Sequence, residues 1–171
     1  EALTAEMRRL RALRSELGLE EMVTFLGAYG QETLPYFYAA AEMLVMPSHY
    51  ESFGMVALEA MACGTPVIAS DVGGLTYTVR DGETGFLIPP HRPEILADNI
   101  ELLLERPDLR QAMGAAGVRR AARYGWPAIA AQIEQVYTQM CAYTRRASHV
   151  GTAAVPRPRL PGATSRGHRA Q

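Results

Sequence analysis

The sequence predicts an α/β domain with a doubly wound, mostly parallel sheet of the Rossmann-like kind. The main observation is that short apolar runs rich in β-branched residues alternate with longer segments of helical periodicity. In addition, the run at residues 43–46 lacks the apolar and polar alternation of a half-solvated strand, which indicates helices on both faces of the sheet. Only about four strands are expected, so the first strand or strands of the sheet are expected to lie upstream of Glu1.

The first half of the chain is divided by glycine and proline residues, which end regular secondary structure. Gly18, Gly27 and Pro47 each follow a periodic or apolar segment. The elements expected here are a helix over residues 3–17, a strand over 22–26, a helix over 31–41 and a strand over 43–46.

The second half continues the alternation and then becomes helical throughout. Its first elements are expected to be a helix over residues 55–63, a strand over 66–70, a short helix ending near residue 80 and a strand over 86–88. Pro93, Pro107 and Pro127 each stand at the start of a helical pattern, where proline is favoured. They predict helices over residues 93–105, 107–124 and 127–143.

Residues 147–171 are predicted to form a disordered tail, which leaves residues 1–146 as the folded domain. The tail is rich in Pro, Gly and Arg, contains no Asp or Glu and has little to bury. Its positive charge could meet nucleic acid or anionic lipid, but a solvated tail is the favoured interpretation. No nucleic-acid partner is therefore expected.

Cysteine usage and hydropathy predict a cytoplasmic protein. Cys63 and Cys141 lie far apart and fit no metal or redox motif, which indicates two reduced thiols. The chain has no apolar run of about 18 residues, so any association with the cytoplasmic membrane face is expected to be peripheral. Because the chain begins without methionine inside a predicted helix, we expect a fragment with sequence missing upstream.

The segment at residues 51–59 has the clearest chemical pattern. Gly54 permits close approach of a ligand to the backbone, and the helix beginning beside it offers unpaired amides and a positive dipole end to a phosphate. Glu51 precedes this helix start and Glu59 follows it. At helical spacing the two carboxylates would be about 12 Å apart, too far for the acid and base of a glycosidase. That separation suits two groups that hold hydroxyls at opposite ends of a nucleotide sugar.

Spacing alone does not establish this role, because two glutamates in such positions are common. Residues 47–70, with the sequence PSHYESFGMVALEAMACGTPVIAS, resemble the retaining glycosyltransferases of family four, which have the two-domain GT-B fold. VTFLG at residues 23–27 is similar to the family's nucleobase-side strand and loop. VGG at 72–74 and DGETGFLI at 81–88 match its next two elements, and YGW at 124–126 resembles the start of its closing helix.

The resemblance implies a role for each matching residue. Glu59 would hold the ribose hydroxyls, and Glu51, as the catalytic residue, would hold donor-sugar hydroxyls and stabilise positive charge developing at the anomeric carbon. The backbone amides near Gly54 would receive the donor sugar and diphosphate. For the side chains of Phe53 and Met55, core packing is an equal alternative. The implied donor-binding residues are Glu51, Ser52, Phe53, Gly54, Met55, Val56 and Glu59, and the implied nucleobase-side residues are Phe25, Leu26, Gly27 and Ala28.

The implied activity of the whole protein is transfer of a sugar from a UDP- or GDP-sugar to an acceptor with retention of configuration. No metal ion or other cofactor is expected, because helix amides and basic residues would neutralise the departing diphosphate. The family's Arg and Lys pair for phosphate precedes the matched region, and this chain contains no lysine. Since the acceptor would bind to the absent N-terminal domain, this chain alone is expected to be inactive.

Two other functions stay open on the sequence. A GT-B epimerase or phosphorylase shares the two-domain architecture, and a noncatalytic module would hold only a nucleotide or a partner chain. Among weaker candidates, His49 either faces the donor or is exposed to water, and His91 is expected to be exposed. Asp71 either lines the cleft or caps the following helix, and the cap is favoured. Trp126 is expected to be a packing anchor rather than a binding platform.

Overall fold

The computed structural model describes residues 4–149 of the 171-residue chain, with side chains described through residue 144. The chain divides into two units, with the boundary between Leu34 and Pro35. Unit 1 contains the helix α1, and unit 2 contains the sheet and the remaining helices.

In unit 1, α1 spans Ala5–Glu16, close to the predicted helix. Thr4 begins the helix, because its hydroxyl oxygen accepts a hydrogen bond from the Met7 amide at 3.2 Å and so satisfies one of the first unpaired amides. Gly18 follows the helix with a φ of 64°, a conformation that glycine adopts without strain.

The strand predicted over residues 22–26 is wrong. Residues 23–30 form no regular element, and Met22 is 83% exposed. The backbone groups of Val23 form hydrogen bonds with residues nearby in the sequence. Its N–H donates to the Leu19 carbonyl at 2.9 Å, and its carbonyl accepts from the Arg14 guanidinium at 3.1 Å. A strand needs these groups for pairing with a neighbouring strand. A β-branched apolar run alone therefore did not suffice to make one.

In unit 2 the described sheet has three strands, all parallel: β1 (Leu44–Met46), β2 (Val67–Ser70) and β3 (Gly85–Ile88). They lie in the order β1-β2-β3. In the register, Met46 pairs with Ala69, and Ser70 pairs with Ile88. The carboxyl ends of the three strands therefore meet at one edge of the sheet.

The helices of unit 2 follow the predicted positions with small shifts at their ends. The 3-10 helix η1 (Ala122–Tyr124) replaces the last turn of the helix predicted over residues 107–124. The α-helices are α2 (Leu34–Ala40), α3 (Met55–Ala62), α4 (Leu75–Thr78), α5 (Pro93–Glu105), α6 (Pro107–Ala121) and α7 (Trp126–His149).

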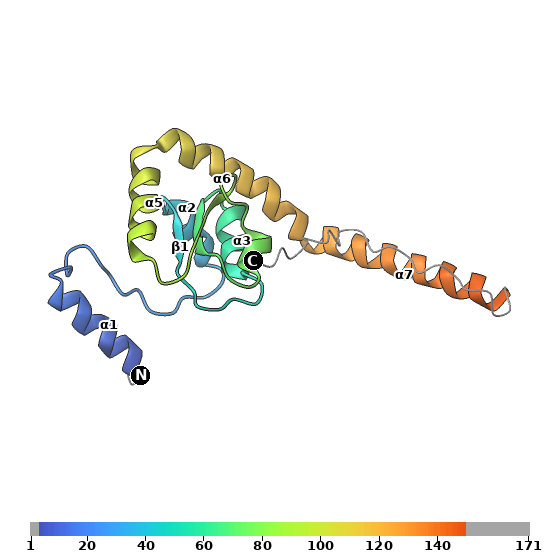
Figure 1. The fold of residues 1–171 in the computed structure, drawn as a ribbon, viewed down its shortest axis with the longest axis horizontal. Helices are drawn as coiled ribbons and strands as arrows, with labels where there is room; N and C mark the ends of the chain where they lie inside the picture. Colours follow the sequence, from blue (N-terminus) through green and yellow to red (C-terminus); the bar gives the residue numbers. More distant parts are fainter. Residues whose placement is uncertain (1–3, 150–171) are drawn as a thin grey trace, which may run out of the picture. The chain divides into compact units, whose positions relative to one another are not determined.

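Apolar clusters cover both faces of the sheet, which confirms the doubly wound prediction. Val67 and Ala69 of β2 point to one face, where they pack against Met61 of α3, whereas Ile68 points to the other face and packs against Leu103 of α5. All five side chains are fully buried. Figure 1 shows the sheet between α3 on one side and α5 on the other. Because β2 is covered on both faces, its first three residues, Val67, Ile68 and Ala69, can all be apolar.

The tail predicted at residues 147–171 lies outside the described residues except at its start, because α7 continues to His149. No described helix combines the length and the apolar character needed to cross a bilayer.

Helix α6 packs directly against the end of α3, beside which it runs in Figure 1. A Cβ atom on Gly114 would overlap the carbonyl oxygen of Gly64, so the two backbones touch at this point. A Cβ atom on Gly117 would instead meet the Met61 side chain at 3.1 Å, and that side chain can shift. The packing of α6 on α3 therefore depends chiefly on Gly114.

We expect Gly114→Ala to destabilise the protein, although Gly→Ala in a helix interior normally stabilises by up to about 1 kcal/mol. The added methyl group must push α6 away from the Gly64 carbonyl, at a cost of about 1–3 kcal/mol. Chemical denaturation would measure the change, with Gly117→Ala as the milder matched substitution. A Gly114→Ala protein more stable than the wild type would contradict this packing.

Candidate functional site

The loop at residues 47–54, here named the Glu51 loop, joins β1 to α3 and leaves the sheet at its carboxyl edge. Ligands of open α/β sheets bind outside this edge. Glu51 is half-buried, Ser52 and Phe53 are exposed, and Gly54 is buried. The loop thus presents polar groups at the expected edge of the sheet.

The turn after β2 holds the Glu51 loop through close backbone contacts. The Gly74 amide donates to the Glu51 carbonyl oxygen at 2.7 Å. A Cβ atom on Gly73 would overlap that same oxygen, and one on Gly74 would overlap the Ser52 carbonyl oxygen and the Phe53 Cα. Only two glycines in succession permit this approach.

Gly54 connects the Glu51 loop to α3 in a conformation that favours glycine. Its φ is 87°, and a Cβ atom at this position would lie 2.9 Å from Leu75 Cδ2 and 3.0 Å from Thr78 Oγ1. A larger residue would be strained by its backbone and also crowded by α4. The start of α3 is therefore fixed against α4.

The Glu51 carboxylate turns back onto its own loop. Its Oε1 atom accepts hydrogen bonds from the amides of Phe53 and Gly54, both at 3.1 Å. The bond from Phe53, followed by that from Gly54, lowers the pKa of Glu51 below its ordinary value of 4.5. Glu51 is thus ionised at neutral pH, and it occupies two amides that the sequence assigns to a donor.

The first turn of α3 retains unpaired amides. Gly54 is its N-cap, and no side chain caps the helix. Since the Gly54 carbonyl accepts from Leu58 as the first intrahelical bond, the amides of Met55 and Val56 have no partner within the helix. The side chains of Met55 and Val56 are 56% and 41% exposed, so core packing does not explain Met55. The helix start can accept an anion.

Glu59 lies on α3 and is held by a tyrosine from α2. The Tyr38 hydroxyl donates to Glu59 Oε2 at 3.0 Å. Burial, and then the hydrogen bond to Glu59, raises the pKa of Tyr38 to about 12, so the hydroxyl keeps its proton at neutral pH. The Tyr38 carbonyl also accepts from the Thr65 hydroxyl at 2.6 Å, which fixes the tyrosine to the turn after α3. Glu59 is therefore oriented, and only one of its oxygens is engaged by Tyr38.

The structure corrects the helical estimate of the separation between Glu51 and Glu59. Because α3 begins at Met55, only Glu59 lies on the helix, and Glu51 precedes its first turn. The two glutamates have separate supports: the Glu51 backbone is held by the glycine turn after β2 and its carboxylate by two amides of its own loop, whereas the Glu59 carboxylate is held by Tyr38. Their arrangement before and within α3 agrees with the sequence prediction, but the rise of a helix does not set their distance.

The predicted nucleobase-side residues lie in unit 1. Phe25 is half-buried, with its ring beneath two guanidinium groups at 5.8 Å from Arg11 and 5.4 Å from Arg14. Such contacts hold an aromatic ring in place. Leu26, Gly27 and Ala28 are exposed, and the Leu26 side chain is 54% accessible. Contact of residues 25–28 with a base stays a prediction.

His49 and His91 approach one another across the carboxyl edge of the sheet. Their rings stack with centroids 4.6 Å apart and planes at 26°, and both residues are exposed, as predicted for His91. His91 has a φ of 59°, which is unusual for a residue other than glycine.

Two weaker predictions are wrong. Asp71 does not cap α4, because the helix begins later, its N-cap is Gly74 and no side chain caps it. The Asp71 amide instead donates to the Ile88 carbonyl at 2.7 Å, which extends the pairing of β2 with β3. Trp126 is 86% exposed at the start of α7 and is therefore no packing anchor within the described residues.

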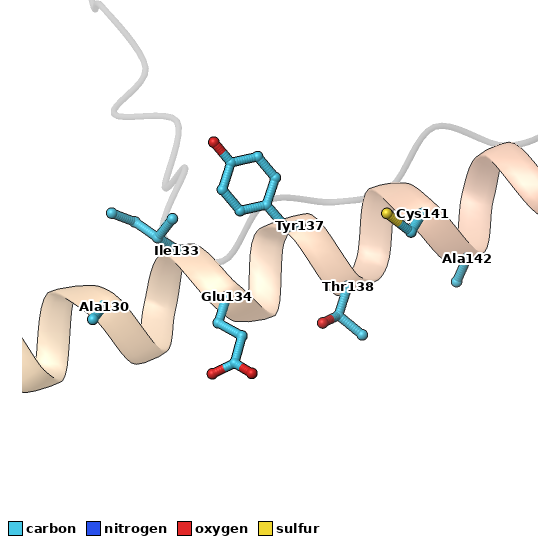
Figure 2. Close-up of a pocket in the computed structure, with 7 residues that line it drawn as sticks. All are labelled: Ala130, Ile133, Glu134, Tyr137, Thr138, Cys141 and Ala142. Carbon is cyan, nitrogen blue, oxygen red and sulfur yellow. The ribbon is translucent and has the colours of Figure 1, made fainter.

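A surface hollow lies elsewhere, along α7, as Figure 2 shows. It includes none of the predicted site residues, and a single helix cannot enclose a ligand, so we assign no function to it. Its described lining residues are Ala130, Ile133, Glu134, Tyr137, Thr138, Cys141 and Ala142. Across the part of the chain with described side chains, no three His, Cys, Asp or Glu residues gather as a metal site would require.

Sequence reasoning missed Tyr38 and the supporting role of Gly73 and Gly74. The adjacent glycines before a helix were a usable signal, because two successive residues without side chains often mark a close backbone approach. No local pattern links Tyr38 to Glu59, since they are 21 positions apart on different helices.

We expect Glu51→Gln to lower the melting temperature at pH 7, because a neutral amide accepts the two backbone hydrogen bonds less strongly than a carboxylate. The pKa of Glu51 is lowered on folding, so its contribution is complete above the unfolded value and disappears as the pH falls through the lowered pKa. The difference in melting temperature between the two proteins should therefore begin to narrow below about pH 5 and disappear as the pH falls further. Thermal melts at several pH values test this, with Glu101→Gln on the exposed face of α5 as control. A gap of constant size down to about pH 2 would contradict it.

Comparisons with known proteins agree with this architecture. Residues 4–120 match the family described as "Glycosyl transferases group 1". A D-inositol 3-phosphate glycosyltransferase from Thermobispora bispora is 45% identical over 142 residues, which are 83% of this chain and 33% of the relative. The chain thus spans about a third of the length of that relative.

Solved structures give the same result. Sucrose-phosphate synthase from Thermosynechococcus elongatus superposes with a TM-score of 0.75 and 47% identity, covering 83% of this chain and 36% of that one. HepE from Anabaena, solved in complexes with UDP, with UDP and glucose, and with UDP-glucose, has 31% identity and a TM-score of 0.72 in its UDP complex, covering 77% and 36%. The chain belongs to the glycosyl transferases group 1 family, and its fold is the C-terminal half of a GT-B fold.

Proposed function

We propose that residues 1–146 form the domain that binds the sugar donor, a nucleoside diphosphate sugar, and that the whole protein transfers this sugar to an acceptor with retention of configuration. The observation that supports this most directly is the start of α3. Its first amides lack intrahelical partners and side-chain caps, and the two glutamates with separate supports stand before and within the helix. This arrangement suits a ligand with a diphosphate between two groups of hydroxyls.

The donor we favour is a UDP-sugar, with a GDP-sugar as the second choice. Support comes from HepE, whose structures contain UDP and UDP-glucose and which is 31% identical to this chain. Contact of the nucleobase with Phe25, Leu26, Gly27 and Ala28 is proposed on the family resemblance alone. The acceptor is assigned to a separate domain of the whole protein.

The proposed chemistry follows from the two carboxylates and the helix start. Glu59, with its orientation set by Tyr38, accepts hydrogen bonds from the ribose hydroxyls. Glu51 binds donor-sugar hydroxyls and stabilises positive charge as the bond between the anomeric carbon and the diphosphate breaks. The new bond to the acceptor oxygen forms on the same face of the sugar, and the proton of the acceptor hydroxyl passes to the departing diphosphate oxygen. The amides of Met55 and Val56 stabilise the departing diphosphate, so the proposal requires no metal ion.

Substitution of the two glutamates should separate binding from turnover. In the full-length protein we expect Glu59→Ala to weaken UDP binding by about 10- to 100-fold, because hydrogen bonds to a charged group contribute about 1.5–3 kcal/mol. We expect Glu51→Ala to slow turnover with much less effect on UDP affinity. Calorimetry with UDP and a donor-consumption assay measure the two effects.

Glu101→Ala is the control for this pair, since Glu101 is an exposed glutamate on α5. Normal UDP affinity in Glu59→Ala, or normal turnover in Glu51→Ala, would refute the assigned roles. A wild-type protein that binds UDP but never transfers a sugar would favour a noncatalytic nucleotide-binding module.

Removal of the Tyr38 hydroxyl should reproduce part of the Glu59→Ala defect. Tyr38→Phe keeps the ring, which packs against the core cluster next to α3, but loses the hydrogen bond to Glu59. We expect UDP affinity to fall by about 3- to 10-fold, with a small change in melting temperature. Titration calorimetry and thermal melts on the same samples measure both quantities.

Tyr36→Phe is the matched control, because the Tyr36 side chain lies on the same helix and is 77% exposed. If Tyr38→Phe binds UDP as tightly as the wild type while Glu59→Ala does not, Tyr38 has no part in orienting Glu59.

A further inference from the structure

Arg120 of α6 binds the end of α4, the short helix beside the Glu51 loop. Its Nε donates to the Thr78 carbonyl at 2.8 Å, and its Nη2 donates to the Tyr77 carbonyl. These carbonyls belong to the last residues of α4, where no intrahelical donor is left for them. A guanidinium at the end of a helix satisfies such groups and complements the negative end of the helix dipole.

Tyr124 of η1 extends this contact to the Glu51 loop. Its hydroxyl accepts from Arg120 Nη2 at 3.1 Å, and its ring lies 5.5 Å from the Arg120 guanidinium. The Phe53 ring contacts the Tyr124 ring edge to face, with centroids 5.9 Å apart and planes at 73°. The Phe53 amide in turn donates to the Glu51 carboxylate. A continuous series of contacts therefore joins Arg120 to Glu51.

Helix α4 supports the Glu51 loop at its other end. Its N-cap residue Gly74 donates to the Glu51 carbonyl, and Leu75 and Thr78 pack against Gly54. A helix of four residues does not hold its own shape, because nucleation costs more than so few hydrogen bonds return. The Arg120 guanidinium supplies the missing partners at the C-terminal end.

We propose that Arg120 and Tyr124 are positioning residues of the proposed donor site. They fix α4 and Phe53, and through these the Glu51 carboxylate and the amides that it holds. In this role they act through their contacts with the protein. The inference rests on the proposed function for its effect on turnover, but its effect on Glu51 can be measured without a donor.

The positioning role predicts a defect in turnover rather than in nucleotide affinity. Glu59 and Tyr38 hold the nucleotide side of the site through a separate hydrogen bond. In the full-length protein we expect Tyr124→Leu and Arg120→Met to lower kcat by about 10- to 100-fold, as small displacements of a catalytic group do. UDP affinity should change by less than about threefold.

Conservative variants guard against simple misfolding. Tyr124→Phe keeps the ring against Phe53, and Arg120→Lys keeps a positive charge near the end of α4, so both should retain more activity than the larger changes. Arg119→Met is the matched control, since Arg119 is an exposed neighbour on the same helix. A double-mutant cycle adds a specific readout: in a Glu51→Ala background, Tyr124→Leu should lower kcat little further.

A second readout needs no donor. If Tyr124→Leu releases Glu51 from its position, the loss of melting temperature caused by Glu51→Gln at pH 7 should be smaller in that background than in the wild type. Unchanged kcat in Arg120→Met and Tyr124→Leu, or additive losses in the cycle together with an unchanged effect of Glu51→Gln on stability, would overturn the inference. A wild type that binds no nucleoside diphosphate would refute the proposed function alone, and the stability measurement would still decide the positioning role.

Discussion

The Glu51 loop owes its position to a contact between two backbones, that of Gly73 and Gly74 and that of residues 51–53. The Gly74 amide donates a hydrogen bond to the Glu51 carbonyl. The two backbone segments lie so close that a Cβ atom on either glycine would overlap the Glu51 loop. With the backbone of Glu51 fixed, its carboxylate reaches the amides of Phe53 and Gly54, and α3 begins at the next residue. The geometry of the site therefore begins in the turn after β2 and reaches the Glu51 carboxylate through the main chain.

The sheet brings the Glu51 loop and the turn after β2 to the same edge, at similar positions along the strand direction. Since β1 and β2 are parallel and Met46 pairs with Ala69, the chain leaves both strands at one edge and within a residue or two of the same height. Helices on both faces bury β2: Met61 covers one side and Leu103 the other. The close packing of α6 on α3 adds a third fixed element, and it places Arg120 near the end of α4. The packing of α6 on α3 is therefore connected to the Glu51 loop through Arg120 and α4.

Most helices were predictable because residues at their ends, such as proline and glycine, mark where they begin and stop. Pro93 and Pro107 stand at the first positions of α5 and α6, and Gly64 follows α3 after its C-cap. The strand expected at residues 22–26 failed because strand formation depends on a neighbour, and the backbone groups of Val23 bind locally instead. In the candidate site, the family pattern located the residues but not their partners. The Tyr38 bond to Glu59 links residues that no periodicity relates, and the turn of the Glu51 carboxylate onto its own loop depends on a side-chain rotamer.

Because the Glu51 carboxylate accepts from the amides of Phe53 and Gly54, a ligand can bind these amides only by replacing the carboxylate. The amides of Phe53 and Gly54 already hold a negatively charged oxygen in the free protein. A ligand oxygen that takes either amide must displace the carboxylate, so the enthalpy from that bond is only a difference between two similar interactions. The displaced carboxylate then needs new donors, and sugar hydroxyls are suitable ones. A ligand that offers an acceptor without nearby hydroxyls would leave a charge unpaired, and the loop would select against it.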